Sequence, residues 1–324
     1  MEIVDVLKIK YGISSVFIKQ LRNNIYKIQT TEKTYALKVY DWAVNHNFLY
    51  TLHQQLKNND FNYFHQIIPT LDRLNSVTEG KLIYTLSEWI EGVKPSFSNK
   101  DHLINASAFL ATFHQAALAS DYSIKAKGPN DFLLPISFYD VRVGQYYNHI
   151  IYEKLKAWVQ QFGTDTLRIA LERMEYAEYI FPLNSYKELV VKEEEKNTFV
   201  HGDYNSSNLI LSSKGQMYVL DFDDSSSYLR VSDLVFLCHL YMGKEGERLL
   251  DILKSYHRVR PLSEIEFEFL KSQLFVPGKI YWEMYCKLLL DQQVSKEWIN
   301  QNLSMYTVNT VYNKIKILSY SDLS

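Results

Sequence analysis

From Phe199 to Leu234 the chain reads FVHGDYNSSNLILSSKGQMYVLDFDDSSSYLRVSDL. It holds three polar clusters in close order: His201 to Asn208, Asp221 to Asp223, and Ser232 to Leu234. Apolar runs separate the first two clusters and flank a Ser-Ser-Lys-Gly turn, which is the pattern of a β-hairpin. Such a hairpin brings the end of the first cluster close to the second. Asp, Asn and Ser also favour ordinary turns, so the three clusters indicate a function only when taken together.

The residue types in these clusters fit phosphoryl transfer. That reaction asks a protein to position the reactants, to hold Mg²⁺ on the phosphates and to orient the attacking hydroxyl with a carboxylate. Mg²⁺ prefers hard oxygen ligands and takes few protein carboxylates. A loop with Asp203 and Asn208, followed by a strand that ends at Asp221, supplies these groups. The sequence therefore predicts a phosphoryl-transfer centre built from these three residues.

The order His-x-Asp-x-x-x-x-Asn, Asp-Phe-Asp and Asp-Leu resembles the signature of the aminoglycoside phosphotransferase and choline kinase family. This family has a protein-kinase-like fold and phosphorylates small molecules. The resemblance implies that Asp203 is the catalytic base and that Asn208 and Asp221 hold Mg²⁺. It also implies structural roles for Asp233, which would brace the catalytic loop, and for His201, which would hold it.

Weaker matches extend the resemblance towards the N-terminus. The segment from Tyr35 to Val39 matches the family's phosphate-binding strand, so Lys38 is implied to contact the α- and β-phosphates of ATP. Taken alone, a strand lysine would be an ordinary solvated side chain. The segment from Leu86 to Gly92 resembles the family's hinge, where backbone groups of Glu88 and Ile90 would hydrogen-bond adenine.

Two features depart from the kinase pattern. The segment from Arg22 to Tyr26 stands in the place of the phosphate-covering loop but lacks its glycines. Kinases of this fold pair the strand lysine with a glutamate on the next helix, yet no acidic residue lies between Asp41 and Asp60. Either another group, such as Asn47 or a remote carboxylate, orients Lys38, or the pairing is lost. The second case would make the chain a weak or inactive kinase.

The whole pattern predicts an α+β, bilobal protein-kinase-like fold with a small β-rich N-lobe and a larger, mostly helical C-lobe. We divide it into residues 1–90, the nucleotide-binding lobe, and residues 91–324, the catalytic and substrate-binding lobe. His114, in a helix that matches a family segment, is expected to be structural. Side-chain periodicity predicts strands at 25–29, 34–40, 67–74 and 82–90, helices at 1–21 (with a break near Gly12), 43–56, 103–118, 145–160 and 166–180, and mostly helical structure after 233.

Composition places the chain among ordinary globular proteins. Its 324 residues are 47% hydrophobic and 22% charged, which suits two lobes with a sizeable core. The net charge of -2 gives no reason to expect nucleic acid or an anionic membrane as a partner. The charged first ten residues do not fit a signal peptide, and no apolar run approaches the roughly 20 residues of a membrane span. Cys238 and Cys286 are expected to be buried thiols, so we expect a cytoplasmic protein.

The sequence thus predicts an ATP- and Mg²⁺-dependent phosphotransferase that moves the γ-phosphate to a hydroxyl of an aminoglycoside, amino-alcohol or sugar. The alternative, which the absent helix glutamate favours, is a weak or inactive kinase-like scaffold. Spore-coat assembly is one such role, because segments such as Tyr186 to Leu189 resemble a bacterial branch with spore-coat-associated members. A protein kinase fits less well, because little room for an activation segment separates Asp221 from Asp233. The roles of Asp223 and Asp224 stay open: they either face an amine substrate or serve as a second metal contact and a turn residue.

Overall fold

The computed structural model describes residues 2–41, 46–118, 145–194, 198–243, 245–276, 287, 294–303 and 309–324. The chain forms two compact units, and each unit takes two separate segments of the sequence. Unit 1 consists of Met1–Pro95 and Ser206–Asp223, and unit 2 consists of Ser96–Asn205 and Asp224–Ser324. These units group residues that contact one another; the functional lobes 1–90 and 91–324 stay a prediction.

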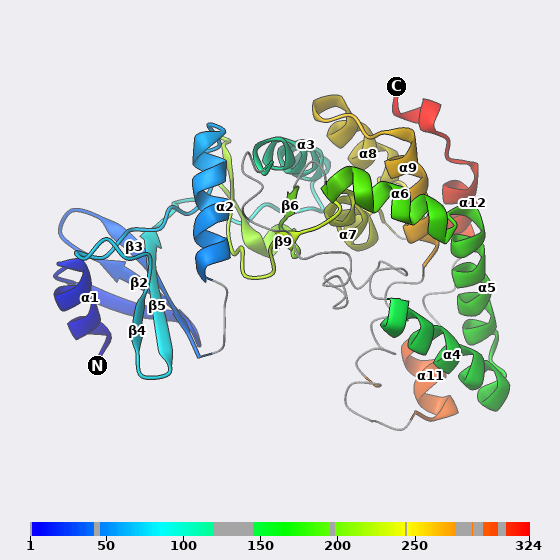
Figure 1. Cartoon of the computed structure of the whole chain (residues 1–324), viewed down its shortest axis with the longest axis horizontal. Helices are drawn as coiled ribbons and strands as arrows, with labels where there is room; N and C mark the ends of the chain where they lie inside the picture. The colour runs from blue at the N-terminus through cyan, green and yellow to red at the C-terminus, as the bar shows by residue number, and fades with distance from the viewer. Residues whose placement is uncertain are drawn as a thin grey trace. The chain divides into compact units, whose positions relative to one another are not determined.

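Unit 1 is built on a five-stranded antiparallel sheet with the strand order β1-β2-β3-β5-β4 (Figure 1). Strands β2 and β3 begin and end where the sequence predicts them. The elements of unit 1 are α1 (Ile3–Tyr11), β1 (Phe17–Arg22), β2 (Ile25–Gln29), β3 (Thr34–Tyr40), α2 (His46–Asn58), β4 (Val77–Glu79), β5 (Leu82–Glu88), the 3₁₀ helix η1 (Ser206–Asn208), β7 (Leu209–Leu211) and β8 (Met217–Val219).

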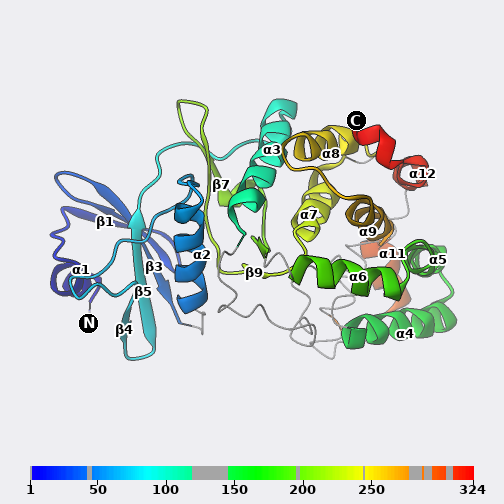
Figure 2. The same cartoon turned by 45° about the horizontal axis from the view of Figure 1, so that its top comes forward.

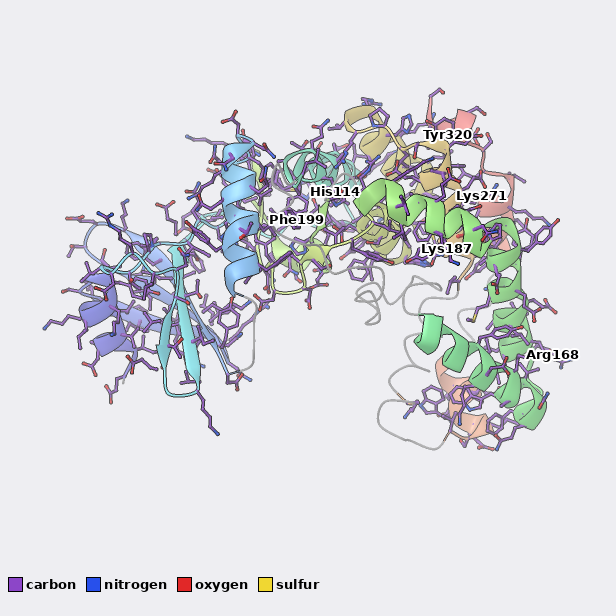
Figure 3. The ribbon with its side chains drawn as sticks, in the orientation of Figure 1. His114, Arg168, Lys187, Phe199, Lys271 and Tyr320 are labelled. Atoms are coloured by element: carbon purple, nitrogen blue, oxygen red, sulfur yellow. The ribbon has the colours of Figure 1, made fainter. Side chains whose placement is uncertain are left out.

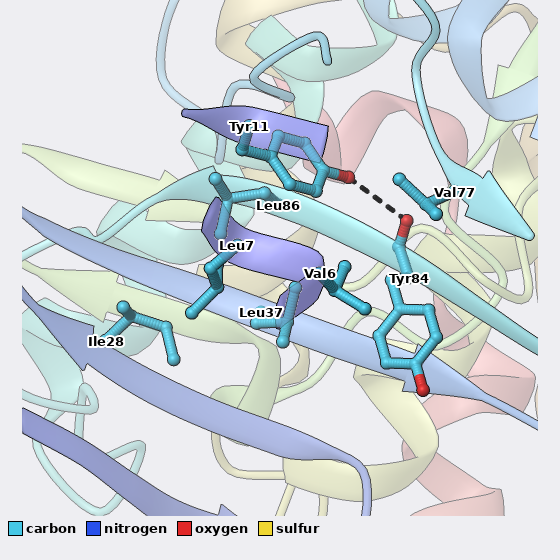
Figure 4. Close-up of a cluster of buried hydrophobic side chains, with 8 residues drawn as sticks. All are labelled: Val6, Leu7, Tyr11, Ile28, Leu37, Val77, Tyr84 and Leu86. Atoms are coloured by element: carbon cyan, nitrogen blue, oxygen red, sulfur yellow. Dashed lines mark hydrogen bonds between the residues drawn. The ribbon is translucent and has the colours of Figure 1, made fainter. Parts of the chain in front are cut away.

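Helix α1 and one face of this sheet enclose a hydrophobic core. The core consists of Val6, Leu7, Tyr11, Ile28, Leu37, Val77, Tyr84 and Leu86 (Figure 4). Successive side chains of a strand point to opposite faces of a sheet. Because Leu37 of β3 lies in the core, its neighbours Ala36 and Lys38 lie on the other face of the sheet. This alternation sets the side chain of Lys38 away from the core.

Two expectations for the N-terminal region are wrong. The helix predicted at 1–21 breaks at Gly12 as expected, where φ is 68°, but Phe17–Arg22 forms β1 instead of further helix. Strand β1 lies at the edge of the sheet with mostly exposed side chains, so it lacks the alternation that marks a half-buried strand. The strand predicted at 67–74 is reduced to one isolated bridge between Ile67 and Ser87.

The later segment of unit 1 joins it through backbone pairing. Strands β7 and β8 form the antiparallel hairpin that the sequence predicts. Val219 of β8 forms a bridge with Phe64, and Leu211 of β7 exchanges backbone hydrogen bonds of 2.7 and 2.9 Å with Val93. A Cβ atom at Gly92 would collide with the carbonyl of Leu211, so this close approach requires glycine.

Unit 2 is mostly helical (Figures 1 and 2). Helix α3 packs against α8, and α7 contacts α3, α8 and α9. Its free cysteine Cys238 is buried as expected, whereas Cys286 lies outside the described residues. The elements of unit 2 are α3 (Lys100–Ala116), α4 (Gln145–Phe162), α5 (Asp165–Ile180), α6 (Leu183–Glu194), β6 (Phe199–Val200), β9 (Ser226–Ser227), α7 (Val231–Tyr241), α8 (Leu249–Val259), α9 (Glu264–Phe275), α11 (Lys296–Leu303), α12 (Asn309–Ile317) and the 3₁₀ helix η3 (Tyr320–Leu323).

The predicted α+β class is confirmed by a five-stranded antiparallel sheet, two two-stranded sheets and many helices in the described residues. The long helices expected at 103–118, 145–160 and 166–180 correspond to α3, α4 and α5, whose ends differ from the prediction by three residues or fewer. Within the described ranges, every helix is too short or too polar to cross a membrane.

Candidate active site

The loop from His201 to Asn205 follows β6 in unit 2 and carries Asp203. Asn205 Nδ2 donates to Asp203 Oδ1 at 2.8 Å, and the Asp203 N–H donates to Nδ1 of the buried His201 at 3.2 Å. Gly202 has a φ of 81°, and a Cβ atom there would collide with the carbonyl of Asp224. The loop therefore needs its glycine, and its own hydrogen bonds hold the carboxylate of Asp203 in place.

Asp233, in the first turn of α7, braces this loop, as the resemblance implies. Its carboxylate accepts the backbone N–H groups of His201 at 2.7 Å and of Gly202 at 3.0 Å. It also lies 3.0 Å from Nε2 of His114, which is labelled in Figure 3. Burial alone would raise the pKa of Asp233, but the hydrogen bonds from His114 and from the His201 backbone lower it below its ordinary value. One buried carboxylate of α7 thus ties the loop that carries Asp203 to both α3 and α7.

The brace continues into a buried hydrogen-bond chain that our sequence analysis missed. Nδ1 of His114 lies 2.8 Å from the hydroxyl of Tyr256, which accepts a hydrogen bond from Nη1 of Arg230 at 2.9 Å. Arg230 also pairs with Glu266: Nε lies 2.6 Å from Oε1, and Nη2 lies 2.8 Å from Oε2. Burial lowers the pKa of His114, which favours the neutral ring. With a neutral ring, donors run in one direction from Arg230 through Tyr256 and His114 to Asp233.

In unit 1, Lys38 has two carboxylate partners. Its Nζ atom lies 2.7 Å from Oδ1 of Asp221 and 2.7 Å from Oδ2 of Asp223. Tyr40, on the same face of β3, donates its hydroxyl to Oδ1 of Asp223 at 3.1 Å. Burial raises the pKa of Asp223, against the opposing effect of the Lys38 charge. The remote carboxylate that the sequence left open as a partner of Lys38 is therefore present.

Helix α2 places an uncharged imidazole, not a carboxylate, against this region. His53 is 4% exposed, and burial lowers its pKa well below the ordinary value. Its ring centroid lies 5.0 Å from that of Phe64, 5.3 Å from that of His65 and 5.3 Å from that of Phe222. The side chain of Asn47, the helix residue considered as a partner of Lys38, lies outside the described residues.

A cavity of about 240 Å³ in unit 1 gathers most of the predicted site. Glu88 lines it, and its N–H donates to the carbonyl of Gln66 at 3.1 Å, which fixes the backbone at the end of β5. The apolar side chains of Ala36 and Leu220 also line the cavity and suit a flat ring. Asp203 belongs to unit 2. The predicted site residues that line this cavity are Lys38, Glu88, Ile90, Asn208 and Asp221.

One group of side chains in this cavity fits Mg²⁺. Asp221 and Asp223 offer carboxylate oxygens that both reach Lys38, and the buried side chain of Asn208 offers an amide oxygen. The Leu220 N–H donates to the Asn208 carbonyl at 2.8 Å and so ties the two ends of the hairpin together. The described part of the chain holds no cluster of three or more His, Cys, Asp or Glu for a metal. Mg²⁺ needs no such cluster, because water and phosphate oxygens complete its shell.

Comparisons with known proteins give one family and a shared fold. The model of the phosphotransferase enzyme family matches residues 16–265, well over half of the chain. No curated protein sequence matches the chain significantly. Among solved structures, the chain is similar to an aminoglycoside phosphotransferase from Alicyclobacillus acidocaldarius, with a TM-score of 0.72 and 16% identity over 98% of each chain.

Two further solved structures are similar over nearly the whole chain. A spectinomycin phosphotransferase in complex with ADP and spectinomycin has a TM-score of 0.61 and 14% identity, over 98% of this chain and 97% of that one. A microcompartment-associated aminopropanol kinase has a TM-score of 0.55 and 16% identity, over 99% of each chain. At such low identities these likenesses show the fold alone, and they confirm the predicted kinase-like α+β fold.

Proposed function

Because the chain belongs to the phosphotransferase enzyme family, we propose that it is an ATP- and Mg²⁺-dependent kinase that transfers the γ-phosphate to a hydroxyl group. Membership of this family makes it a small-molecule phosphotransferase; the donor, the metal and the acceptor are the proposal. The observation that carries the proposal is the cavity of unit 1, where Lys38 lies 2.7 Å from the carboxylates of both Asp221 and Asp223.

On this proposal Lys38 contacts the α- and β-phosphates of the nucleotide. The ammonium group of a lysine sits on a flexible stem and would populate other rotamers unless a carboxylate held it. Asp223, itself held by the Tyr40 hydroxyl at 3.1 Å, takes the part that a helix glutamate plays in other kinases. Asp221 and Asn208 would hold Mg²⁺, which neutralises charge on the phosphate oxygens when bound.

For the acceptor, Asp203 is the proposed general base. Its carboxylate accepts a hydrogen bond from the acceptor hydroxyl and takes the proton as the oxygen attacks the γ-phosphorus. A bond forms between the acceptor oxygen and phosphorus, the bond from phosphorus to the β–γ bridging oxygen breaks, and ADP leaves. Asn205, 2.8 Å from Oδ1, orients the carboxylate, and Asp233 keeps the backbone of the loop in place.

The acceptor is proposed to be a small hydroxyl compound of the aminoglycoside, amino-alcohol or sugar class. The similar solved structures include one with bound spectinomycin and one aminopropanol kinase, which supports this range. A nucleotide-binding scaffold without turnover is the alternative that the missing helix glutamate favours. The pairing of Lys38 with Asp223 weighs against it, since the lysine has a carboxylate partner of its own.

We expect ATP together with Mg²⁺ to raise the temperature of thermal unfolding more than ATP alone. Ligand at about a hundred times its Kd stabilises the folded state by roughly 2.7 kcal/mol, which amounts to several degrees for a unit of this size. The Asp221→Asn protein should lose the metal-dependent part of this rise, because it lacks a proposed metal ligand.

The control is Asp72→Asn, which changes an exposed carboxylate outside the cavity lining. If a well-folded wild-type protein shows no rise with ATP and Mg²⁺, the proposed donor is wrong. If the rise is present, ADP formation with amino-alcohols, aminoglycosides and sugars distinguishes a kinase from a scaffold, which would release no ADP with any of them.

Replacement of Asp223 by Asn should raise the KM for ATP by about 10- to 100-fold, because a hydrogen bond to a charged group contributes roughly 1.5–3 kcal/mol. The amide keeps the shape of the side chain but offers Lys38 no negative charge. The measurement is steady-state kinetics with varied ATP at saturating acceptor. An unchanged KM for ATP would show that Lys38 needs no second carboxylate.

A further inference from the structure

We propose that Arg22 and Lys94 form a second anion-binding contact of the unit 1 cavity, which holds phosphate groups of the donor nucleotide in addition to Lys38. Both side chains line the cavity that Lys38 also lines. Both are exposed, so they stand where the cavity opens to solvent. This inference rests on the proposed function, because it concerns the same nucleotide site.

The position of Arg22 follows from the first strand pair of the sheet. The pairing of β1 with β2 shifts register between Gln20 and Arg22, so Arg22 comes to lie opposite Ile25 across a two-residue turn. Gln20 Nε2 donates to the carbonyl of Asn23 at 3.1 Å, which holds this turn. Kinases bind phosphates here through backbone N–H groups of a glycine-rich loop. This chain has no glycine in the turn and presents a guanidinium at its base, a group that binds phosphate in a bidentate manner.

The position of Lys94 follows from backbone pairing with β7. It follows Val93, whose N–H and carbonyl are both bonded to Leu211 of β7. The residue before, Gly92, approaches the Leu211 carbonyl too closely to carry a Cβ atom. The backbone that presents Lys94 is therefore pinned against β7, while its side chain reaches the cavity lining.

The two cations lie close enough to affect each other, and neither forms an ion pair with a carboxylate of the described residues. The pKa of Lys94 is lowered by its partial burial and by the nearby charge of Arg22. Lys27 pairs with Glu91 at 3.3 Å and Lys38 with its two aspartates, whereas neither Arg22 nor Lys94 has an ion-pair partner among the residues that the structure describes. Two like charges held together cost free energy, and a bound anion would offset that cost.

The charge of the cavity lining explains what these cations would do. The lining includes three lysine or arginine cations and three carboxylates: Arg22, Lys38, Lys94, Glu88, Asp221 and Asp223. Without Arg22 and Lys94, two negative charges would be left in excess, and they would repel a nucleotide polyphosphate. The pair therefore balances the carboxylates that the lysine and the metal require.

The test is a series of equilibrium binding measurements with adenosine, AMP and ADP, each with and without Mg²⁺. We compare the wild-type protein with Arg22→Gln, Lys94→Gln and the double variant. The matched control is Lys33→Gln, which changes an exposed lysine that does not line the cavity. All three substitutions are at exposed side chains, so unfolding without ligand should stay as in the wild type.

In the wild type we expect affinity to rise from adenosine to ADP. In each cavity variant the ratio of ADP affinity to adenosine affinity should be about three- to tenfold lower than in the wild type, while adenosine binding stays unchanged. The reason is that an exposed charge pair contributes roughly 0.2–1 kcal/mol and a charge-assisted hydrogen bond more. The salt dependence of ADP binding should also be weaker in the cavity variants than in the wild type, since salt screens exposed charges. Lys33→Gln should change neither quantity.

Two outcomes would overturn the inference. In the first, the rise in affinity from adenosine to ADP is the same in all proteins. In the second, a cavity variant loses affinity for adenosine and for ADP equally, which indicates a change of cavity shape. In these cases the wild type still binds nucleotide, so the proposed function stands. If the wild type binds none of the three ligands, the proposed function fails together with this inference.

Discussion

Replacement of Asp203 by Asn should lower kcat by about 10²- to 10⁴-fold, the usual contribution of a general base. The amide has nearly the same shape and can still accept the hydrogen bond of the acceptor hydroxyl through its oxygen. It cannot take the proton, so the attacking oxygen must lose its proton to water. The measurement is steady-state turnover, by ADP formation, with the best acceptor found.

Nucleotide binding separates this effect from a loss of structure. The groups proposed to bind ATP, Lys38 and Asp221 among them, line the cavity of unit 1, whereas Asp203 belongs to unit 2. The rise in unfolding temperature with ATP and Mg²⁺ should therefore stay as in the wild type. Near-normal turnover in the Asp203→Asn protein would rule out the proposed base.

Replacement of Glu266 by Ala should lower the free energy of unfolding by about 3–5 kcal/mol, the usual effect of removing one partner of a buried ion pair. Glu266 is 1% exposed and Arg230 is 3% exposed, and two of their atom pairs lie within 2.8 Å. Without the carboxylate, the guanidinium of Arg230 stays buried with an uncompensated charge. Denaturant unfolding at neutral pH is the measurement.

A matched control comes from the same helix. Glu264→Ala removes an exposed carboxylate two residues earlier, where the helix dipole makes a negative charge worth only about 0.3–1 kcal/mol. Joint replacement of Arg230 by Met and Glu266 by Leu should recover much of the lost stability, because no buried charge is left unpaired. A loss in Glu266→Ala no greater than in Glu264→Ala would contradict this account.

The same pair has a defined pH dependence. Burial alone would raise the pKa of Glu266, but the Arg230 charge and the hydrogen bonds from Ser263 lower it below the ordinary value of 4.5. A lowered folded-state pKa means that the stability of the pair is fully present above the unfolded pKa and is lost as the pH falls through the folded value. The difference in free energy of unfolding between the wild type and Glu266→Ala should therefore become smaller as the pH falls into the acid range.

Local sequence patterns found the elements whose signals lie within a few residues. Strands β2 and β3 and the β7–β8 hairpin show clear alternation or turn chemistry, and all three are where the sequence predicts them. Strand β1 was missed because an edge strand with exposed side chains has no such alternation. The Ser263–Glu266 capping box at the start of α9 is a readable local signal that could have drawn attention to Glu266.

The family resemblance, the α+β class and the residues proposed for phosphoryl transfer could be read from the sequence alone, because spacing within a loop or strand fixes which groups share a face. The packing of distant segments was needed to find that Lys38 pairs with Asp223, 185 residues away in the chain, and that Arg230 and Glu266 form one buried pair. Periodicity is a property of neighbouring residues, whereas such pairings depend on how separate segments pack, and burial then selects the charges that can be kept.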